Sequence, residues 1–335
     1  MSNNMNQKNI NQDIKVKDLK RFYDESFVPS QEYLDSMPDL QNADFEGIPI
    51  EYVGMTGIKT PLRIKQRDGG EQEVLATVNA MCDIDSHRAG LNMSRLYRQL
   101  GMGVNETFDI NRLEEVLRRY KNSQNSLDSH IQVNFKYRIW QDALRSINDD
   151  GTKPGGWYYV NCTFDANIDK NNEFKKILWV DYIYASNCPC STELTYYNMQ
   201  SRGHYGAPHN QRSVARFGIE FDELVWIEDV IDLAKKAVGT MVQIHVKRID
   251  ELSFSELCGT PGEKGGGTVF VEDAARLFAK QLNSEPKILN WCVILSHFES
   301  LHPWQASAFI TKDKNSIFNH HVRNGEWLDL ARTAI

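Results

Sequence analysis

Apolar and polar residues alternate along many segments of the chain, and this pattern predicts strands. In the first half we expect strands over residues 60–65, 73–83, 131–135 and 157–164. Between the second and third of these, Leu113, Val116 and Leu117 recur at helical spacing, which predicts an amphipathic helix over residues 112–120. The first half therefore combines strands with a helix that has one apolar face.

The second half shows a similar order of elements. The pattern predicts strands over residues 176–184, 212–221, 290–297 and 306–311, and helices over residues 224–238 and 272–282. A further strand is expected over residues 241–246. Antiparallel strands interrupted by paired helices favour an α+β unit with its helices on one face of the sheet. We predict a polar leader (residues 1–45) and two tandem copies of this unit (residues 46–170 and 171–335).

Composition limits the cellular setting and the class of partner. The 335 residues include 41% hydrophobic and 25% charged residues, as in globular proteins, and the net charge of −7 disfavours general nucleic-acid binding. The six cysteines are too few and too scattered for a disulfide scaffold. No signal peptide or membrane-spanning apolar run is present. We therefore expect a cytoplasmic protein.

The most informative motif is Cys188-Pro189-Cys190-Ser191, followed by His209. Two cysteines separated by one residue cannot close an unstrained disulfide. Thiolate and imidazole together favour zinc or another borderline metal over calcium or magnesium. Cys188 alone is also compatible with a buried structural thiol, and His209 alone with a hydrogen-bonded histidine. Their combination indicates a metal site.

Several carboxylates have both a functional and a structural interpretation. On the residues alone, Asp250-Glu251 is best described as a solvated charge cluster, and Glu272 as an acidic residue favoured by a helix dipole. Glu299 and His302, three residues apart, could transfer protons near neutral pH or could belong to a surface loop.

Two arginines are the best candidates to bind phosphate. Arg95 and Arg212 both have polar sequence neighbours, and a guanidinium offers paired donors to phosphate oxygens. The sequence contains no P-loop, no dinucleotide-binding glycine fingerprint and no His-Glu-x-x-His motif.

Five motifs occur in a characteristic order: Cys-Pro-Cys-Ser, His-Asn-Gln-Arg-Ser, Asp-Glu after Lys-Arg, Phe-Val-Glu-Asp and Phe-Glu-Ser-x-His. In this combination the chain resembles the GTP cyclohydrolase IB family, from about Met37 to the last strands. The resemblance implies the tunnelling fold (T-fold), with two modules and a homotetramer whose active sites lie between subunits. It also implies hydrolysis of the guanine imidazole ring of GTP, giving formate and 7,8-dihydroneopterin triphosphate, the first step toward folate.

The resemblance also implies roles for individual residues. Cys188, His209 and Glu251 match the metal ligands, and Glu272 matches the acid that anchors the guanine edge. Cys190, Glu299 and His302 match catalytic residues, beside Cys188 itself. Zinc, manganese or iron would serve as the metal, and no organic cofactor is expected.

The sequence departs from the family pattern in two places. Asn92 stands where many members have histidine, and the connection between Cys190 and His209 is longer by a stretch around residues 198–204. His204 in this stretch could compete with His209 as a ligand. Alternative functions are a nitrile reductase that uses NADPH and a nucleophilic cysteine, and a non-catalytic paralogue that binds GTP or metal.

Overall fold

The computed structural model describes residues 23–39, 46–101, 107–108, 110, 112–312 and 318. Most of the predicted polar leader lies outside these residues. Its described part includes one short exposed helix, α1 (Gln31–Asp35), which begins where the Ser30 hydroxyl accepts a hydrogen bond from the Tyr33 amide.

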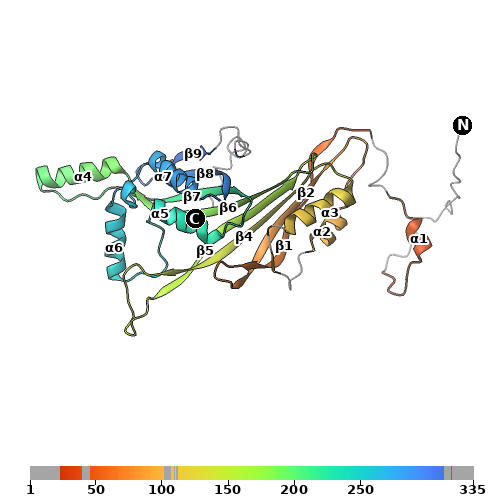
Figure 1. Ribbon diagram of the computed structural model, residues 1–335, viewed down its shortest axis with the longest axis horizontal. Coiled ribbons are helices and arrows are strands. Elements are labelled where there is room, and N and C mark those ends of the chain that lie inside the picture. Colours follow the sequence, from red (N-terminus) through yellow and green to blue (C-terminus); the bar gives the residue numbers. More distant parts are fainter. Residues whose placement is uncertain are drawn as a thin grey trace.

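A single nine-stranded sheet runs through the described chain in the order β3-β1-β2-β4-β5-β6-β7-β8-β9 (Figure 1). All neighbouring strands are antiparallel except β1 and β3. The strands are β1 (Ile50–Lys65), β2 (Glu71–Ile84), β3 (Thr107–Phe108), β4 (Ser129–Asp142), β5 (Gly155–Ile168), β6 (Phe174–Asn187), β7 (Asn210–Phe221), β8 (Ile288–Phe298) and β9 (Ala306–Thr311). Pairing of β5 with β6 joins the N-terminal half (β1 to β5) to the C-terminal half (β6 to β9).

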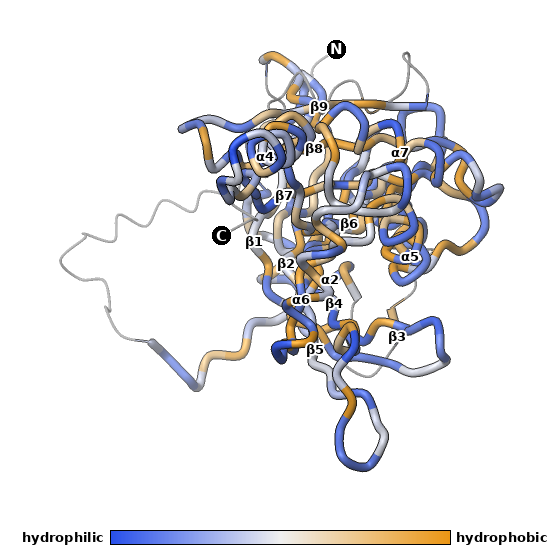
Figure 2. The backbone as a smooth tube through the Cα atoms, turned by 90° about the vertical axis from the view of Figure 1, so that its left-hand side faces the viewer, coloured by the Kyte–Doolittle hydropathy of each residue, from blue (hydrophilic) through white to orange (hydrophobic). Residues whose placement is uncertain are grey.

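Helices cover one face of this sheet. They are α2 (Met93–Leu100) and α3 (Arg112–Gln124) in the N-terminal half, and α5 (Ile227–Ala237) and α7 (Val271–Asn283) in the C-terminal half. Their apolar stripes pack against alternate strand residues: Phe278 of α7 is fully buried against the rings of Tyr182, Tyr184 and Phe217. In Figure 2 the hydrophobic segments follow the strands and packed helices, whereas the connecting loops are mainly hydrophilic. No helix in the described ranges combines the length and apolarity needed to cross a membrane.

The predicted α+β class is confirmed, because an almost entirely antiparallel sheet is covered by helices on one face. Each half has two strands, then helices, then two more strands, but β3 separates α2 from α3 in the N-terminal half, and α4 separates β6 from β7 in the C-terminal half. Four of the described α-helices were not predicted: α1, α2, α4 (Pro189–Arg202) and α6 (Arg248–Gly259). The predicted strand over residues 241–246 is wrong. Only Met241 forms an isolated bridge there, while the side chain of Gln141 binds Val242 O and Ile244 N at 2.9 Å each. This side chain takes the place of a neighbouring strand.

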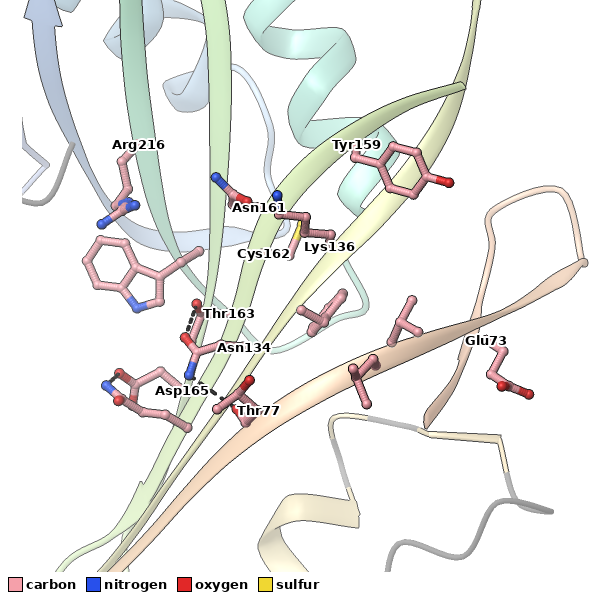
Figure 3. A pocket seen from close by; sticks show the side chains of 15 residues that line it. Glu73, Thr77, Asn134, Lys136, Tyr159, Asn161, Cys162, Thr163, Asp165 and Arg216 are labelled. Atoms are coloured by element: carbon pink, nitrogen blue, oxygen red, sulfur yellow. Dashed lines mark hydrogen bonds between the residues drawn. The ribbon is translucent and has the colours of Figure 1, made fainter. Parts of the chain in front are cut away.

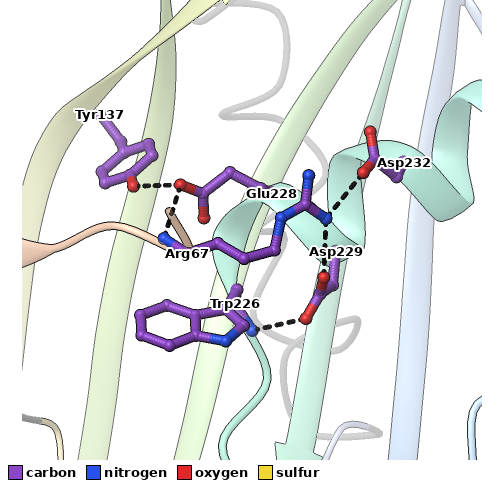
Figure 4. Close-up of polar contacts among 6 residues, drawn as sticks. All are labelled: Arg67, Tyr137, Trp226, Glu228, Asp229 and Asp232. Atoms are coloured by element: carbon purple, nitrogen blue, oxygen red, sulfur yellow. Dashed lines mark hydrogen bonds and ion pairs between the residues drawn. The ribbon is translucent and has the colours of Figure 1, made fainter. Parts of the chain in front are cut away.

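The turn between β1 and β2 ties the two halves together (Figure 4). Arg67 Nη1 lies 2.8 Å from carboxylate oxygens of both Asp229 and Asp232 on α5. Tyr137 of β4 donates a hydrogen bond of 2.6 Å to Glu228, which also accepts the Arg67 amide at 3.3 Å. These contacts hold α5 against the N-terminal half.

Candidate active site

Three strand ends meet at one edge of the C-terminal half. Cys188 directly follows β6, His209 directly precedes β7, and Glu299 directly follows β8. The last register pair of β6 and β7 is Asn187 with Asn210, and the next contact is a 3.4 Å hydrogen bond from Cys188 N to His209 O. Antiparallel pairing therefore brings together residues that are far apart in sequence.

His209 and Glu299 form the centre of this cluster. His209 Nδ1 lies 3.4 Å from Glu299 Oε2, and the two side chains are 19% and 14% exposed. Gln211 Nε2 donates a hydrogen bond of 3.4 Å to Glu299 Oε1. His209 Nδ1, Glu299 Oε2 and Gln211 Oε1 are buried and have no hydrogen-bond partner. Buried polar atoms without partners are costly, so this group is suited to receive a proton, a ligand or a cation.

The two cysteines of the motif lie where α4 begins. Cys188 occupies the N-cap position and Pro189 follows it in the first turn, where its missing N–H costs nothing. The Thr192 amide and hydroxyl both donate to Cys188 O at 3.0 Å. Cys188 is half-buried, Cys190 is exposed, and both thiols are free. The backbone of Cys188 is therefore fixed at the strand end by these hydrogen bonds.

Glu251 and Arg212 line an adjoining cavity of about 450 Å³. Glu251 comes from the first turn of α6, and Arg212 from β7. Tyr184, Gln211 and Phe254 also line this cavity. Because Gln211 binds Glu299 as well, the cavity borders the cluster at the strand ends.

Asp250, the neighbour of Glu251, is in a different environment. Its side chain is buried and accepts hydrogen bonds from the Arg145 and Ser146 amides at 2.7 and 2.9 Å, from the Lys247 amide at 2.9 Å, and from the Ser146 hydroxyl. Burial alone would raise the pKa of Asp250, but these hydrogen bonds lower it well below its ordinary value. Asp250 is thus a structural anchor and not the solvated charge expected from sequence.

Glu272 lies exposed in the first turn of α7. The segment before α7 runs beside the end of β6: Asn187 N donates to Gly267 O at 2.8 Å, and Val269 N donates to Asn187 O at 3.2 Å. Since Asn187 precedes Cys188, the chain entering α7 passes next to the strand-end cluster.

Arg95 lies in the N-terminal half, away from the other candidates. Its Nη1 donates to Ser123 O at 3.2 Å, and its amide is capped by the Asn92 side chain at 3.3 Å. Figure 1 shows α4, which begins beside Cys188, at the left end of the molecule, and α2, which carries Arg95, far to its right beyond the C-terminal half. Because the Asn92 side chain accepts the Arg95 amide, Asn92 acts as the N-cap of α2.

The two remaining histidine candidates are exposed. His302 lies in the loop after β8 and stacks on Trp304, with ring centroids 4.9 Å apart. His204 follows α4, where its carbonyl accepts a hydrogen bond of 3.1 Å from Asn198.

The structure thus brings Cys188, His209 and Glu299 to neighbouring strand ends and puts Glu251 in the adjoining cavity. Within the part of the chain that the structure describes, no group of three or more His, Cys, Asp or Glu side chains is arranged to hold a metal ion.

A buried polar chain behind the cluster was missed by the sequence analysis. Tyr184 Oη lies 2.8 Å from His297 Nε2, Ser186 Oγ lies 3.4 Å from His297 Nδ1, and Ser186 and Ser213 hydroxyls are 2.8 Å apart. Burial lowers the pKa of His297 to about 4, so the imidazole is neutral at pH 7. One feature of the sequence could have indicated this chain. His297 lies on the same side of β8 as the apolar residues Trp291, Val293 and Leu295, all of which are buried.

The face of the sheet without helices holds a larger cavity of about 770 Å³, lined by both polar and apolar side chains (Figure 3). Thr163 donates to Asn134 at 2.7 Å, and Arg216 binds Asp181 through two contacts of 2.7 and 3.0 Å. None of the cluster residues lines this cavity.

Comparisons with known proteins identify the class. Residues 37–308 match the family model described as type I GTP cyclohydrolase FolE2. A GTP cyclohydrolase FolE2 from Cereibacter sphaeroides is 35% identical over 302 residues, covering 88% of this chain and 80% of the relative. Another from Roseobacter denitrificans is 36% identical, covering 86% and 77%. The chain belongs to the type I GTP cyclohydrolase FolE2 family, which confirms the predicted resemblance at this level.

Solved structures that align with most of the chain include uricases. The uricase from Arthrobacter globiformis aligns with a TM-score of 0.45 at 9% identity, covering 82% of this chain and 98% of that one.

Proposed function

We propose that this protein is a metal-dependent GTP cyclohydrolase, which converts GTP and water to 7,8-dihydroneopterin triphosphate and formate. The observation that carries the proposal is the meeting of Cys188, His209 and Glu299 at neighbouring strand ends in a chain of this family. The reaction would begin the synthesis of folate.

A divalent metal fits the chemistry of these side chains. His209 Nδ1 and Glu299 Oε2 are buried without hydrogen-bond partners, and Cys188 is a half-buried free cysteine at the adjacent strand end. Cys188, His209 and Glu251 would hold the ion, which would be zinc, manganese or iron. A bound metal lowers the pKa of a coordinated water toward 7 and so supplies a nucleophile for C8 of guanine.

Proton transfer would fall to the polar groups around His209. Glu299 is oriented by Gln211 and has one buried oxygen without a partner, so it can accept a proton from the attacking water or return one to a ring nitrogen. Cys190 and His302 are exposed, and they follow Cys188 and Glu299 by two and three residues in the sequence. They would donate or accept protons in the later steps of the reaction.

Substrate binding would use a carboxylate and two arginines. The Glu272 carboxylate can accept both N–H groups on the Watson–Crick edge of guanine. Arg212, in the cavity with Glu251, would bind the triphosphate.

Arg95 could reach such a site only from another copy of the chain, because α2 lies far from α4 in the N-terminal half (Figure 1). This separation supports active sites that are shared between subunits, as in the homotetramer that we propose.

The direct test is incubation of the purified protein with GTP and manganese, followed by oxidation and measurement of pterin fluorescence and formate. We expect equal amounts of both products, and none after chelation. Absence of pterin and formate with every divalent metal tried would refute the proposal. NADPH consumption that is insensitive to chelators would instead indicate nitrile reduction.

A further inference from the structure

Two adjacent carboxylates on α6 differ completely in environment. Asp250 is 1% exposed, whereas Glu251 is exposed and lines the cavity beside the strand-end cluster. We propose that Asp250 is a positioning residue through which the N-terminal half fixes Glu251 at the active site. The inference rests on the proposed function, in which Glu251 is a metal ligand.

The hydrogen bonds of Asp250 connect two distant segments. One carboxylate oxygen accepts the amides of Arg145 and Ser146 at 2.7 and 2.9 Å, and these residues lie in the connection between β4 and β5. The other oxygen accepts the Lys247 amide at 2.9 Å and the Ser146 hydroxyl. Three of the four donors therefore come from the N-terminal half. Figure 1 shows α6 beside this connection.

A second contact holds the segment that leads into α6. Gln141 of β4, also buried, binds Val242 O and Ile244 N through its side-chain amide, at 2.9 Å each. Val242 lines the same cavity as Glu251. The N-terminal half is thus hydrogen-bonded to this segment at two places, before α6 through Gln141 and in the first turn of α6 through Asp250.

These contacts exceed what helix capping requires. The Lys247 amide alone would satisfy a capping carboxylate at the third position of α6. Burying a carboxylate is costly unless its oxygens are fully hydrogen-bonded. A carboxylate buried against the N-terminal half therefore fixes the direction in which the next residue leaves the helix. Partners that orient metal ligands typically contribute a factor of about 10 to 100 in metal affinity.

The test is titration of the metal-free protein with cobalt(II), followed by absorption spectroscopy, in Asp250→Asn, Glu251→Gln and Glu256→Gln variants. Glu256 is the matched control, because it lies on the same helix and its side chain forms an exposed 3.4 Å ion pair with Arg145, which the substitution removes without touching Asp250. We expect Asp250→Asn to weaken cobalt binding by about 10- to 100-fold. The sulfur-to-cobalt charge-transfer band from Cys188 should persist while the ligand-field bands change. Glu256→Gln should bind as the wild type does.

Each outcome bears on a defined claim. Wild-type affinity in Asp250→Asn, with binding lost in Glu251→Gln, would overturn the positioning role alone. Wild-type affinity in Glu251→Gln would overturn the ligand role and the inference with it. The expected binding pattern in a protein that makes no pterin would support the inference while refuting the cyclohydrolase activity.

If circular dichroism shows that Asp250→Asn does not fold, Ser146→Ala takes its place. This change removes only the hydroxyl donor and leaves the Ser146 amide bound to Asp250. Cobalt binding should weaken roughly fivefold, the usual effect of one hydrogen bond. Unchanged binding in the folded Ser146→Ala variant would overturn the inference.

Discussion

The buried imidazole of His297 makes a quantitative prediction about stability in acid. Burial lowers its pKa from 6.5 to about 4, while Tyr184 and Ser186 hold its two ring nitrogens. Between these two pH values the unfolded chain binds a proton that the folded protein does not. The free energy of unfolding must therefore fall as the pH falls through this window.

The size of the effect follows from the difference between the two pKa values. A shift from 6.5 to about 4 corresponds to a loss of about 3 kcal/mol once the pH has fallen to 4. At pH 5, roughly 2 kcal/mol of this should already be lost. Replacing His297 with Gln removes the titrating group, so the variant should lose less stability on acidification than the wild type.

Urea unfolding of the metal-free protein measures this directly. The wild type and the His297→Gln variant are compared at one protein concentration between pH 7.5 and 4.5, because association changes apparent stability. The carboxylates are the same in both proteins, so their contribution to the pH dependence cancels when the unfolding free energy of the variant is subtracted from that of the wild type. A constant offset between the two curves reflects the cost of the substitution itself. Parallel curves over the whole range would refute the assignment of a neutral, buried His297.

Three further predictions concern the site and the contact between the halves. Cys188→Ala should abolish pterin formation and sharply lower the metal content measured by elemental analysis; wild-type metal loading would remove Cys188 from the ligand set. Glu272→Gln should raise the KM for GTP or lower kcat while metal content stays constant, and unchanged GTP kinetics would mean that guanine is anchored elsewhere. Arg67→Ala should lower the free energy of unfolding by only about 0.2–1 kcal/mol in a urea titration, because its partners Asp229 and Asp232 are partly exposed. A loss of several kcal/mol would show that this contact is essential for joining the halves.

The regular elements of the fold were predictable from local patterns, and the exceptions have physical causes. Strands β2 and β4 alternate between buried and more exposed residues because helices cover only one of their faces. Strands β6, β7 and β8 are buried on both faces over most of their length, so their predicted strands rest on apolar runs as well as on alternation. Helix α4 gives no such signal, since none of its residues is buried and no apolar stripe is needed. The segment after Met241 resembles a strand in sequence, but Gln141 from the other half satisfies its backbone instead. That contact cannot be read from the local sequence.

The candidate site was predictable in its parts but not in its arrangement. Cys188 and His209 stand out in sequence because polar, metal-binding side chains directly follow or precede strands. The 3.4 Å approach of Glu299 to His209 depends on how β7 and β8 pair across the sheet. The contrast between Asp250 and Glu251 depends on donors that lie over a hundred residues away. Tertiary contacts of this kind leave no trace in residue spacing.

The excursion that contains α4 leaves the sheet at Cys188 and returns at His209, and its two ends are joined by a hydrogen bond of 3.4 Å. Because the ends are fixed by the pairing of β6 and β7, residues can be added to or removed from the tip without moving either side chain. A change in the length of this excursion is therefore compatible with an unchanged spacing between Cys188 and His209, and the tip is free to vary.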